Sequence, residues 1–147
     1  MLISTKGRYA LRLMIDLAEH ERDGYIPLKE IADRQEISEK YLDAILRGLV
    51  KGRLIESLRG KGGGYKLSRS PAQYKVGDIL RLTEDTLAPV ACMEKNASPC
   101  ARMAHCPTLP MWQALDLVIN QFFDSFTLAD LARTNPTEQS PSAGREV

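Results

Sequence analysis

Three cysteines are the residues whose type and spacing could do chemistry in this chain. Cys92, Cys100 and Cys106 have the spacing C-x7-C-x5-C, within one stretch that shows no helical or strand period. Thiolates in a loop are the usual ligands of iron–sulfur clusters, although no paired C-x2-C is present. Zinc would suit three thiolates and a fourth ligand equally well. A structural disulfide is disfavoured because the number of cysteines is odd and a reducing compartment is expected.

A second stretch with chemical potential is the basic, glycine-rich loop RGKGGG at 59–64. From Arg47 to Arg69 the chain has seven Lys and Arg residues and one acidic residue. Glycines allow positive φ and a close approach of the backbone to another surface. The loop joins two predicted strands, whereas a nucleotide phosphate loop runs from a strand into a helix. DNA phosphates or a narrow minor groove are therefore the expected ligands of Arg59, Lys61 and Gly62.

Two short helices that precede this loop would position it. Residues 28–33 form the first, a turn follows at 34–37, and Ser38 caps the second with its hydroxyl. Gly52 is expected to end the second helix in the left-handed conformation. Its buried stripe at helical spacing is Leu42, Ile45, Leu46 and Leu49. The pattern predicts a helix-turn-helix, followed by a hairpin wing of strands at 54–58 and 65–68.

The face opposite that stripe would meet DNA, because the first turns of such a helix reach base edges in the major groove. The Asp43 carboxylate can accept from a cytosine amino group, with a solvated helix residue as the alternative. Lys6, near the start of a helix predicted from Ser4 or Thr5 to about Glu21, could meet a phosphate or simply be solvated. The candidate contacts on the helices are Lys6, Ser38, Lys40, Tyr41, Asp43 and Arg47.

The second half of the chain has a different pattern. A short helix is predicted at 76–83, an irregular stretch at 85–108, and a long apolar helix at about 109–126 with Thr108 as its cap. Apolar residues step by three and four along the long helix, as in a coiled-coil seam. They are Trp112, Leu115, Ile119, Phe122 and Phe126. Such a helix must bury two faces, and a second subunit is the simplest cover for one of them.

The end of the chain holds one more helix signal. Thr127 and Asp130 have the spacing of a capping box on a short final helix. The polar residues 134–147 are predicted to be disordered.

Charge and hydropathy favour a cytoplasmic DNA-binding protein. No apolar run approaches membrane-spanning length, and the first residues lack the apolar core of a signal peptide. An enzyme is not expected, because no Ser/His/Asp or Cys/His arrangement is evident and there are only two histidines. Residues 1–75 contain 15 basic and 10 acidic side chains, whereas residues 76–147 contain 5 and 9. The basic half is thus the half with the helix-turn-helix.

Five segments resemble the Rrf-type winged-helix repressors, the group that contains IscR, NsrR, RirA and CymR. They are MLISTKGRYA at 1–10, ISEKYL at 37–42, RGKGGGY at 59–65, VGDI at 76–79 and TLADL at 127–131. The resemblance covers about residues 1–133. It implies a homodimeric regulator of double-stranded DNA operators. It also implies an iron–sulfur cluster, [2Fe-2S] or [4Fe-4S], at the three cysteines, because cluster-binding members have three cysteines in this loop.

The fourth cluster ligand is left open by the resemblance. IscR-like members have a His three residues after the third cysteine, where this chain has Leu109, and NsrR-like members have an acidic residue where it has Arg8. The seven-residue first gap is closer to RirA-like regulators. His105, next to Cys106, is a candidate, and Glu94, water or a small thiol are alternatives.

Together these observations predict a mainly α fold with a small β-hairpin. A winged helix-turn-helix at 1–84 is followed by a cysteine-containing sensor loop at 85–108, a dimerisation helix and short terminal helix at 109–133, and the tail at 134–147. The predicted function is a transcription regulator, expected to repress, whose operator affinity depends on a cluster. The alternative is a cluster-free regulator of the same fold, controlled by a partner protein or by thiol oxidation.

Overall fold

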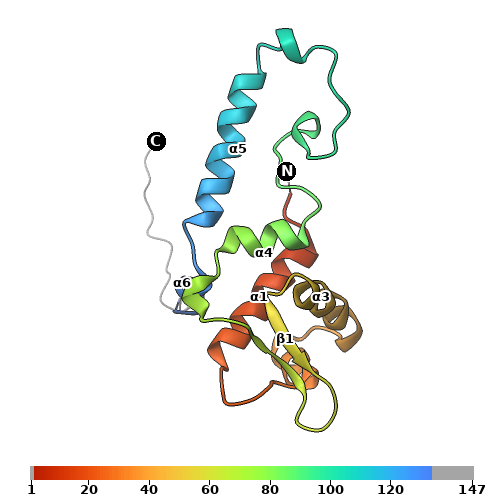
Figure 1. The fold of residues 1–147 in the computed structure, drawn as a ribbon, viewed down its shortest axis with the longest axis vertical. Coiled ribbons are helices and arrows are strands. Elements are labelled where there is room, and N and C mark those ends of the chain that lie inside the picture. Colours follow the sequence, from red (N-terminus) through yellow and green to blue (C-terminus); the bar gives the residue numbers. More distant parts are fainter. Residues whose placement is uncertain (1, 134–147) are drawn as a thin grey trace.

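The computed structural model describes residues 2–133, and Figure 1 shows the predicted combination of helices with one small hairpin. The predicted tail at 134–147 lies outside the described residues. In chain order the elements are α1 (Thr5–Glu19), α2 (Leu28–Gln35), α3 (Glu39–Lys51), β1 (Ile55–Leu58), β2 (Gly64–Leu67), α4 (Val76–Thr83), α5 (Leu109–Asp124) and α6 (Leu128–Arg133). Helix α5 projects from the unit formed by the other elements, and residues 85–108 run outward beside it and join its far end (Figure 1).

The helix-turn-helix consists of α2 and α3. The Ser38 hydroxyl accepts from the backbone N–H of Tyr41 at 3.3 Å, which confirms the predicted cap. Helix α2 is longer than predicted and includes Arg34 and Gln35, which the sequence placed in the turn. The reason is that Glu36 alone reverses the chain, in the left-handed conformation with φ 55° and ψ 44°.

The prediction for Gly52 is wrong. Its φ is −77°, and Arg53 takes the left-handed conformation instead, with φ 60°. Glycine is required at this point for another reason, because a Cβ on Gly52 would overlap the side chain of Leu82. Leu82 itself is 40% exposed.

The wing is an antiparallel hairpin in which Ile55 pairs with Leu67 and Leu58 with Gly64. Three glycines of the connecting loop have positive φ, as the sequence predicts: Gly60 at 90°, Gly62 at 75° and Gly64 at 145°. Gly64 also lies against the backbone of Ile26, where any Cβ would clash. Residues before α2 therefore add a short bridge to the hairpin, from Ile26 to Tyr65, and fix the wing beside the helix-turn-helix.

The core surrounds α1, whose buried residues include Ala10, Leu13, Met14 and Leu17. The predicted stripe of α3 packs against them, so all four leucine and isoleucine residues of that stripe are buried. Helix α6 also packs on α1, and its Leu128 is fully buried in the same core. The last described helix thus belongs physically to the winged helix. The capping box of Thr127 and Asp130 is confirmed, with bonds of 2.8 and 3.1 Å.

Tyr74 fixes the exit of the wing. Its ring is fully buried, and its hydroxyl donates to the Leu54 carbonyl at 2.6 Å. The same oxygen accepts from the backbone N–H groups of Ser68 at 2.9 Å and Arg69 at 3.2 Å. One phenol therefore joins both sides of the hairpin base.

Replacing Tyr74 with Phe should lower the free energy of unfolding by about 1–3 kcal/mol, because the Leu54 carbonyl loses its donor and two N–H groups lose their acceptor. Urea unfolding followed by circular dichroism measures this change. A Tyr25→Phe variant serves as a control on a less buried tyrosine and should change stability far less. Equal effects of the two substitutions would show that the Tyr74 hydroxyl does not stabilise the hairpin base.

The loop at 85–108 is held to the winged helix at its start, and its end joins the outer end of α5. At its start, Glu84 accepts from the Ser4 hydroxyl at 2.7 Å, and Ser4 in turn caps α1 by accepting from Gly7 N–H at 3.1 Å. Beyond its end, Arg81 of α4 donates to Asp124 of α5 at 2.6 Å. The loop contains only short 3-10 turns, as its lack of period predicts.

Candidate DNA interface and cysteine loop

The first candidate site is a cleft of about 710 Å³ between α3 and the wing. Asp43 and Arg47 line it from α3, and Arg59 and Tyr65 line it from the hairpin. The side chain of Arg47 is 80% exposed and forms an ion pair with Asp43 at 2.7 Å. The structure therefore brings three predicted DNA contacts, Asp43, Arg47 and Arg59, to one cleft. This cleft is open to solvent and has a basic rim.

The other predicted contacts lie outside the lining of this cleft. Lys6, Ser38, Lys40, Lys61 and Gly62 are all exposed, on α1, α3 and the tip of the wing. The hydroxyl of Ser38 is used as the helix cap. None of these assignments to DNA is tested by the geometry, and they stay predictions.

Tyr41 of α3 is partly shielded from solvent. It is 38% exposed and meets the Tyr9 ring edge-on, with 5.7 Å between the ring centroids. Its hydrophobic contact is therefore with α1, and only part of its ring remains for a partner of α3.

Tyr65 is a cleft residue that the sequence did not single out. Burial, and then the nearby Asp43 carboxylate, raise its pKa above the ordinary value. Its phenol is thus neutral and able to donate a hydrogen bond near Asp43. The signal in the sequence was its place directly after the glycines, at the start of the second strand.

The cysteine loop is the second candidate site. Cys92 and Cys100 are exposed and Cys106 is half-buried, and all three are free thiols. Within residues 2–133 no three His, Cys, Asp or Glu side chains are gathered closely enough to hold a metal ion. The donor chemistry of three thiols in one loop suits a cluster, but the described conformation leaves them apart, so ligation requires the loop to rearrange.

Cys106 has a specific partner. Its sulfur lies 3.4 Å from the Thr108 hydroxyl, and hydrogen bonds with Thr108 lower the pKa of the thiol. Thr108 was predicted to cap α5, but its side chain makes no capping bond, because it turns to the sulfur instead. The candidate ligands His105 and Glu94 are exposed, and Leu109 begins α5.

Helix α5 has no buried residue in the described chain. Met111, Leu115, Val118 and Phe122 share one side of it at helical spacing, with exposed fractions of 39–58%. Phe122 packs edge-on against Phe123 and Phe126, at centroid distances of 5.8 and 5.3 Å. An apolar face of this length on a projecting helix is typical of a surface that another chain covers.

The chain matches a known family over almost all of its described residues. A family model named Rrf2, described as "Iron-dependent Transcriptional regulator", matches residues 3–134. The chain belongs to the Rrf2 family. The sequence-based resemblance to Rrf-type winged-helix regulators is thereby confirmed, and members of this family are transcriptional regulators and not enzymes.

Individual relatives agree with the Rrf2 assignment. The chain is 39% identical over 133 residues to Protein rrf2 of Nitratidesulfovibrio vulgaris, covering 90% of this chain and 88% of the relative. It is 34% identical over 139 residues to the HTH-type transcriptional regulator IscR of Aliivibrio salmonicida, covering 95% and 82%. The structure of CymR, the global cysteine regulator of B. subtilis, matches with a TM-score of 0.71 and 36% identity over 90% of this chain and 96% of CymR.

The Rrf2 relatives confirm a helix-turn-helix regulator of transcription, and the winged fold agrees with them. Among residues 2–133 no helix has the length and apolar character needed to cross a membrane.

Proposed function

We propose that this Rrf2 regulator acts as a homodimer whose two α3 helices read adjacent major grooves of an operator in the cytoplasm. The observation that supports this most is the cleft that places Asp43, Arg47 and Arg59 together beside an exposed helix face. In each subunit the first turns of α3 meet base edges. Asp43 accepts from a cytosine amino group once the operator draws Arg47 away toward a phosphate. The wing lies on the neighbouring backbone or in the minor groove.

Replacing Arg59 with Ala should weaken operator binding about tenfold at low salt and reduce the dependence of affinity on salt, because one cation fewer meets the phosphates. Gel-shift titrations at several salt concentrations measure both quantities. Arg133→Ala is the matched control, because Arg133 is exposed at the end of α6 and does not line the cleft. Unchanged affinity of the Arg59 variant would remove the wing from the interface.

We further propose that Cys92, Cys100 and Cys106 hold an iron–sulfur cluster and that its presence alters operator affinity. The "iron-dependent" description of the family and the three thiols of the loop support this. The lowered pKa of Cys106 favours the thiolate that iron binds. When bound, such a cluster supplies iron and sulfide whose presence or oxidation state depends on iron availability, redox conditions or nitric oxide. His105 is a candidate for the fourth position.

The route from the loop to DNA follows from the contact at its start and from the helix α5 at its end. Glu84 holds the start of the loop to the first turn of α1, where Lys6 is exposed. The loop ends at α5, which Arg81 joins to α4 of the winged helix. Any ordering of residues 85–108 therefore bears on α1 and on the direction of α5, and α5 sets the distance between the two recognition helices of a dimer.

The test is anaerobic reconstitution with ferrous iron and sulfide, followed by iron analysis, absorption and Mössbauer spectra, and gel shifts of the loaded and unloaded protein. We expect a coloured protein whose operator affinity differs from that of the unloaded form. A Cys100→Ser variant should bind less iron and lose this difference, whereas Ser98→Ala, two residues away, should retain both. A colourless wild-type protein without iron would reject the cluster.

A second candidate function has support in the same loop. All three thiols are accessible or half-buried, and they are not gathered in the described conformation. CymR is described as a global cysteine regulator, and one solved CymR from Staphylococcus aureus is an oxidised form. In this reading the thiols themselves respond to oxidation or to a partner protein. Operator affinity that changes with hydrogen peroxide in iron-free protein would favour it over the cluster.

A further inference from the structure

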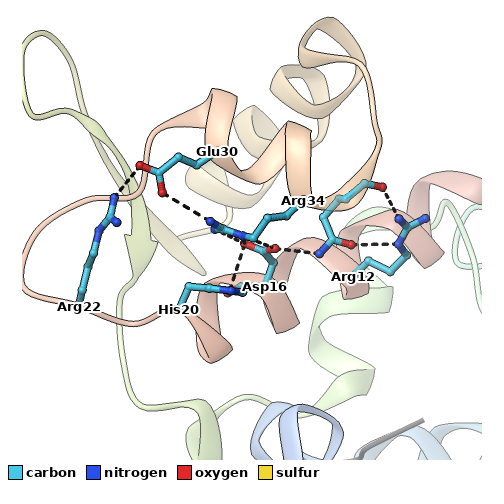
Figure 2. Close-up of polar contacts among 7 residues, drawn as sticks. Arg12, Asp16, His20, Arg22, Glu30 and Arg34 are labelled. Carbon is cyan, nitrogen blue, oxygen red and sulfur yellow. Dashed lines mark hydrogen bonds and ion pairs between the residues drawn. The ribbon is translucent and has the colours of Figure 1, made fainter. Parts of the chain in front are cut away.

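A buried carboxylate lies beneath the helix-turn-helix. Asp16 of α1 has a side chain that is 1% exposed. Arg34 donates to it from Nη2 at 2.7 Å and from Nε at 3.0 Å, and Gln35 donates from Nε2 at 2.8 Å (Figure 2). Both donor residues belong to the last turn of α2. One carboxylate of α1 therefore holds the end of α2 through several charge-assisted hydrogen bonds.

The same contact continues toward the recognition helix. The other amide atom of Gln35, Oε1, accepts from Arg12 Nε at 3.1 Å, and the Arg12 guanidinium also donates to the Gln35 carbonyl (Figure 2). Arg12 lies over the Tyr9 ring, 5.0 Å from its centroid. Tyr9 in turn packs edge-on against Tyr41 of α3. A chain of contacts thus runs from Asp16, through the end of α2, to the face of α3.

The connection between α2 and α3 leaves little freedom. After Gln35 only the left-handed Glu36, the nearly buried Ile37 and the capping Ser38 precede α3. Because these three residues each have a defined role, the place where α2 ends sets the place where α3 begins. A shift at Gln35 would therefore move the base-reading turns of α3 relative to α1 and the wing.

A buried ion pair contributes little net stability, because desolvation of the charges offsets their attraction. Its better-supported role is to select one arrangement among several of similar energy. Here the Asp16 hydrogen bond raises the pKa of Arg34, so the guanidinium stays charged and two-pronged. Lys29 and Asp33 form a different kind of ion pair on the outside of α2. Their side chains are 74% and 68% exposed, so this pair is neither buried nor two-pronged.

We propose that Asp16 is a positioning residue for DNA reading, which acts through Gln35 and Arg34 to fix α3 in the orientation that discriminates among sequences. The inference rests on the proposed reading of DNA by α3. It assigns to a residue that touches no DNA a share of sequence discrimination, separate from phosphate affinity. Loss of the contact should leave non-specific binding intact, because the exposed cations of α3 and the wing are unchanged.

The experiment uses full-length protein and a duplex selected by the wild type from a random-sequence pool, with a scrambled duplex of equal composition as the reference. Gln35→Ala is the main variant, since Gln35 is uncharged and half-exposed. It should lower the ratio of selected to scrambled affinity by about tenfold, with unchanged affinity for the scrambled duplex and an unchanged salt slope. Asp16→Asn should lower this ratio further. Asp33→Asn is the control and should keep it.

Two results separate the inference from the proposed function. If the wild type selects no duplex over the scrambled one, reading by α3 fails. If it does, and the folded Gln35→Ala protein keeps the wild-type ratio, the positioning role of Asp16 is overturned. Hydrogen exchange gives an independent measurement should Asp16→Asn lose stability. Faster exchange at residues 36–42 than in the hairpin supports local release of α3, whereas equal acceleration in both indicates global destabilisation only and counts against the inference.

Discussion

Replacing Phe122 with Asp is expected to convert the proposed dimer into a monomer and to lower operator affinity by a factor of about 100 or more. Phe122 is 58% exposed at the C-terminal end of the apolar face of α5, in edge-on contact with Phe123 and Phe126. A carboxylate there would be buried without a partner in any interface formed by this face. Two linked recognition helices bind far more tightly than one, because the second half-site is met at high effective concentration.

Light scattering on a sizing column measures the mass, and gel shifts measure the affinity. The matched control is Gln113→Asp, the same new carboxylate on an exposed residue at the opposite side of α5. It should remain dimeric. A Phe122→Asp protein that is still a dimer would show that this face of α5 is not the interface, and a monomer with full affinity would show that dimerisation is not needed for binding.

Replacing Leu128 with Ala is expected to lower the free energy of unfolding by about 2–5 kcal/mol. Leu128 is fully buried in the core around α1, and its backbone N–H donates to the Tyr74 carbonyl at 3.0 Å. Removal of its methyl groups would leave a cavity between α6 and α1. Since small domains are stable by only about 5–15 kcal/mol, this loss is a large share of the total.

Urea unfolding monitored by circular dichroism at 222 nm measures the loss, with Leu2→Ala as the control. Leu2 is 91% exposed, so the same substitution there should change the free energy of unfolding by no more than about 0.5 kcal/mol. Similar values for the two variants would mean that α6 is not part of the cooperative unit formed by the winged helix.

Local patterns in the sequence were sufficient to predict the helix-turn-helix, the wing, α4 and the capping box at Thr127. Each depends on residues a few positions apart, such as the Ser38 cap or the glycines of the wing. The errors at Gly52 and Thr108 have a different origin. At Gly52 the decisive neighbour is Leu82, which is distant in sequence, whereas at Thr108 a local competitor, the Cys106 sulfur two residues earlier, takes the hydroxyl expected to cap α5.

Long-range polar contacts could not be predicted, because the two partners of each contact are distant in sequence. Glu84 meets Ser4 across 80 positions of the chain, and no periodicity encodes that distance. Asp16 had one detectable signal, since it lies three residues after Leu13 and one before Leu17, at the edge of the buried stripe of α1. An acid at such a position indicates a buried partner, but the partner on α2 becomes evident only when the helices are packed. The roles of the cysteines in ligation stay a prediction, because the described loop leaves them apart.

The place of α6 has a consequence for synthesis on the ribosome. The core around α1 is closed by Leu128, and 44 residues from Glu84 to Thr127 must be translated before that side chain emerges. At roughly 5–20 residues per second, the nascent winged helix waits about 2–9 s with an open apolar surface. The cysteine loop is itself translated during that interval, ahead of Leu128, so its thiols can meet iron, oxidants or chaperones before the DNA-reading unit is complete.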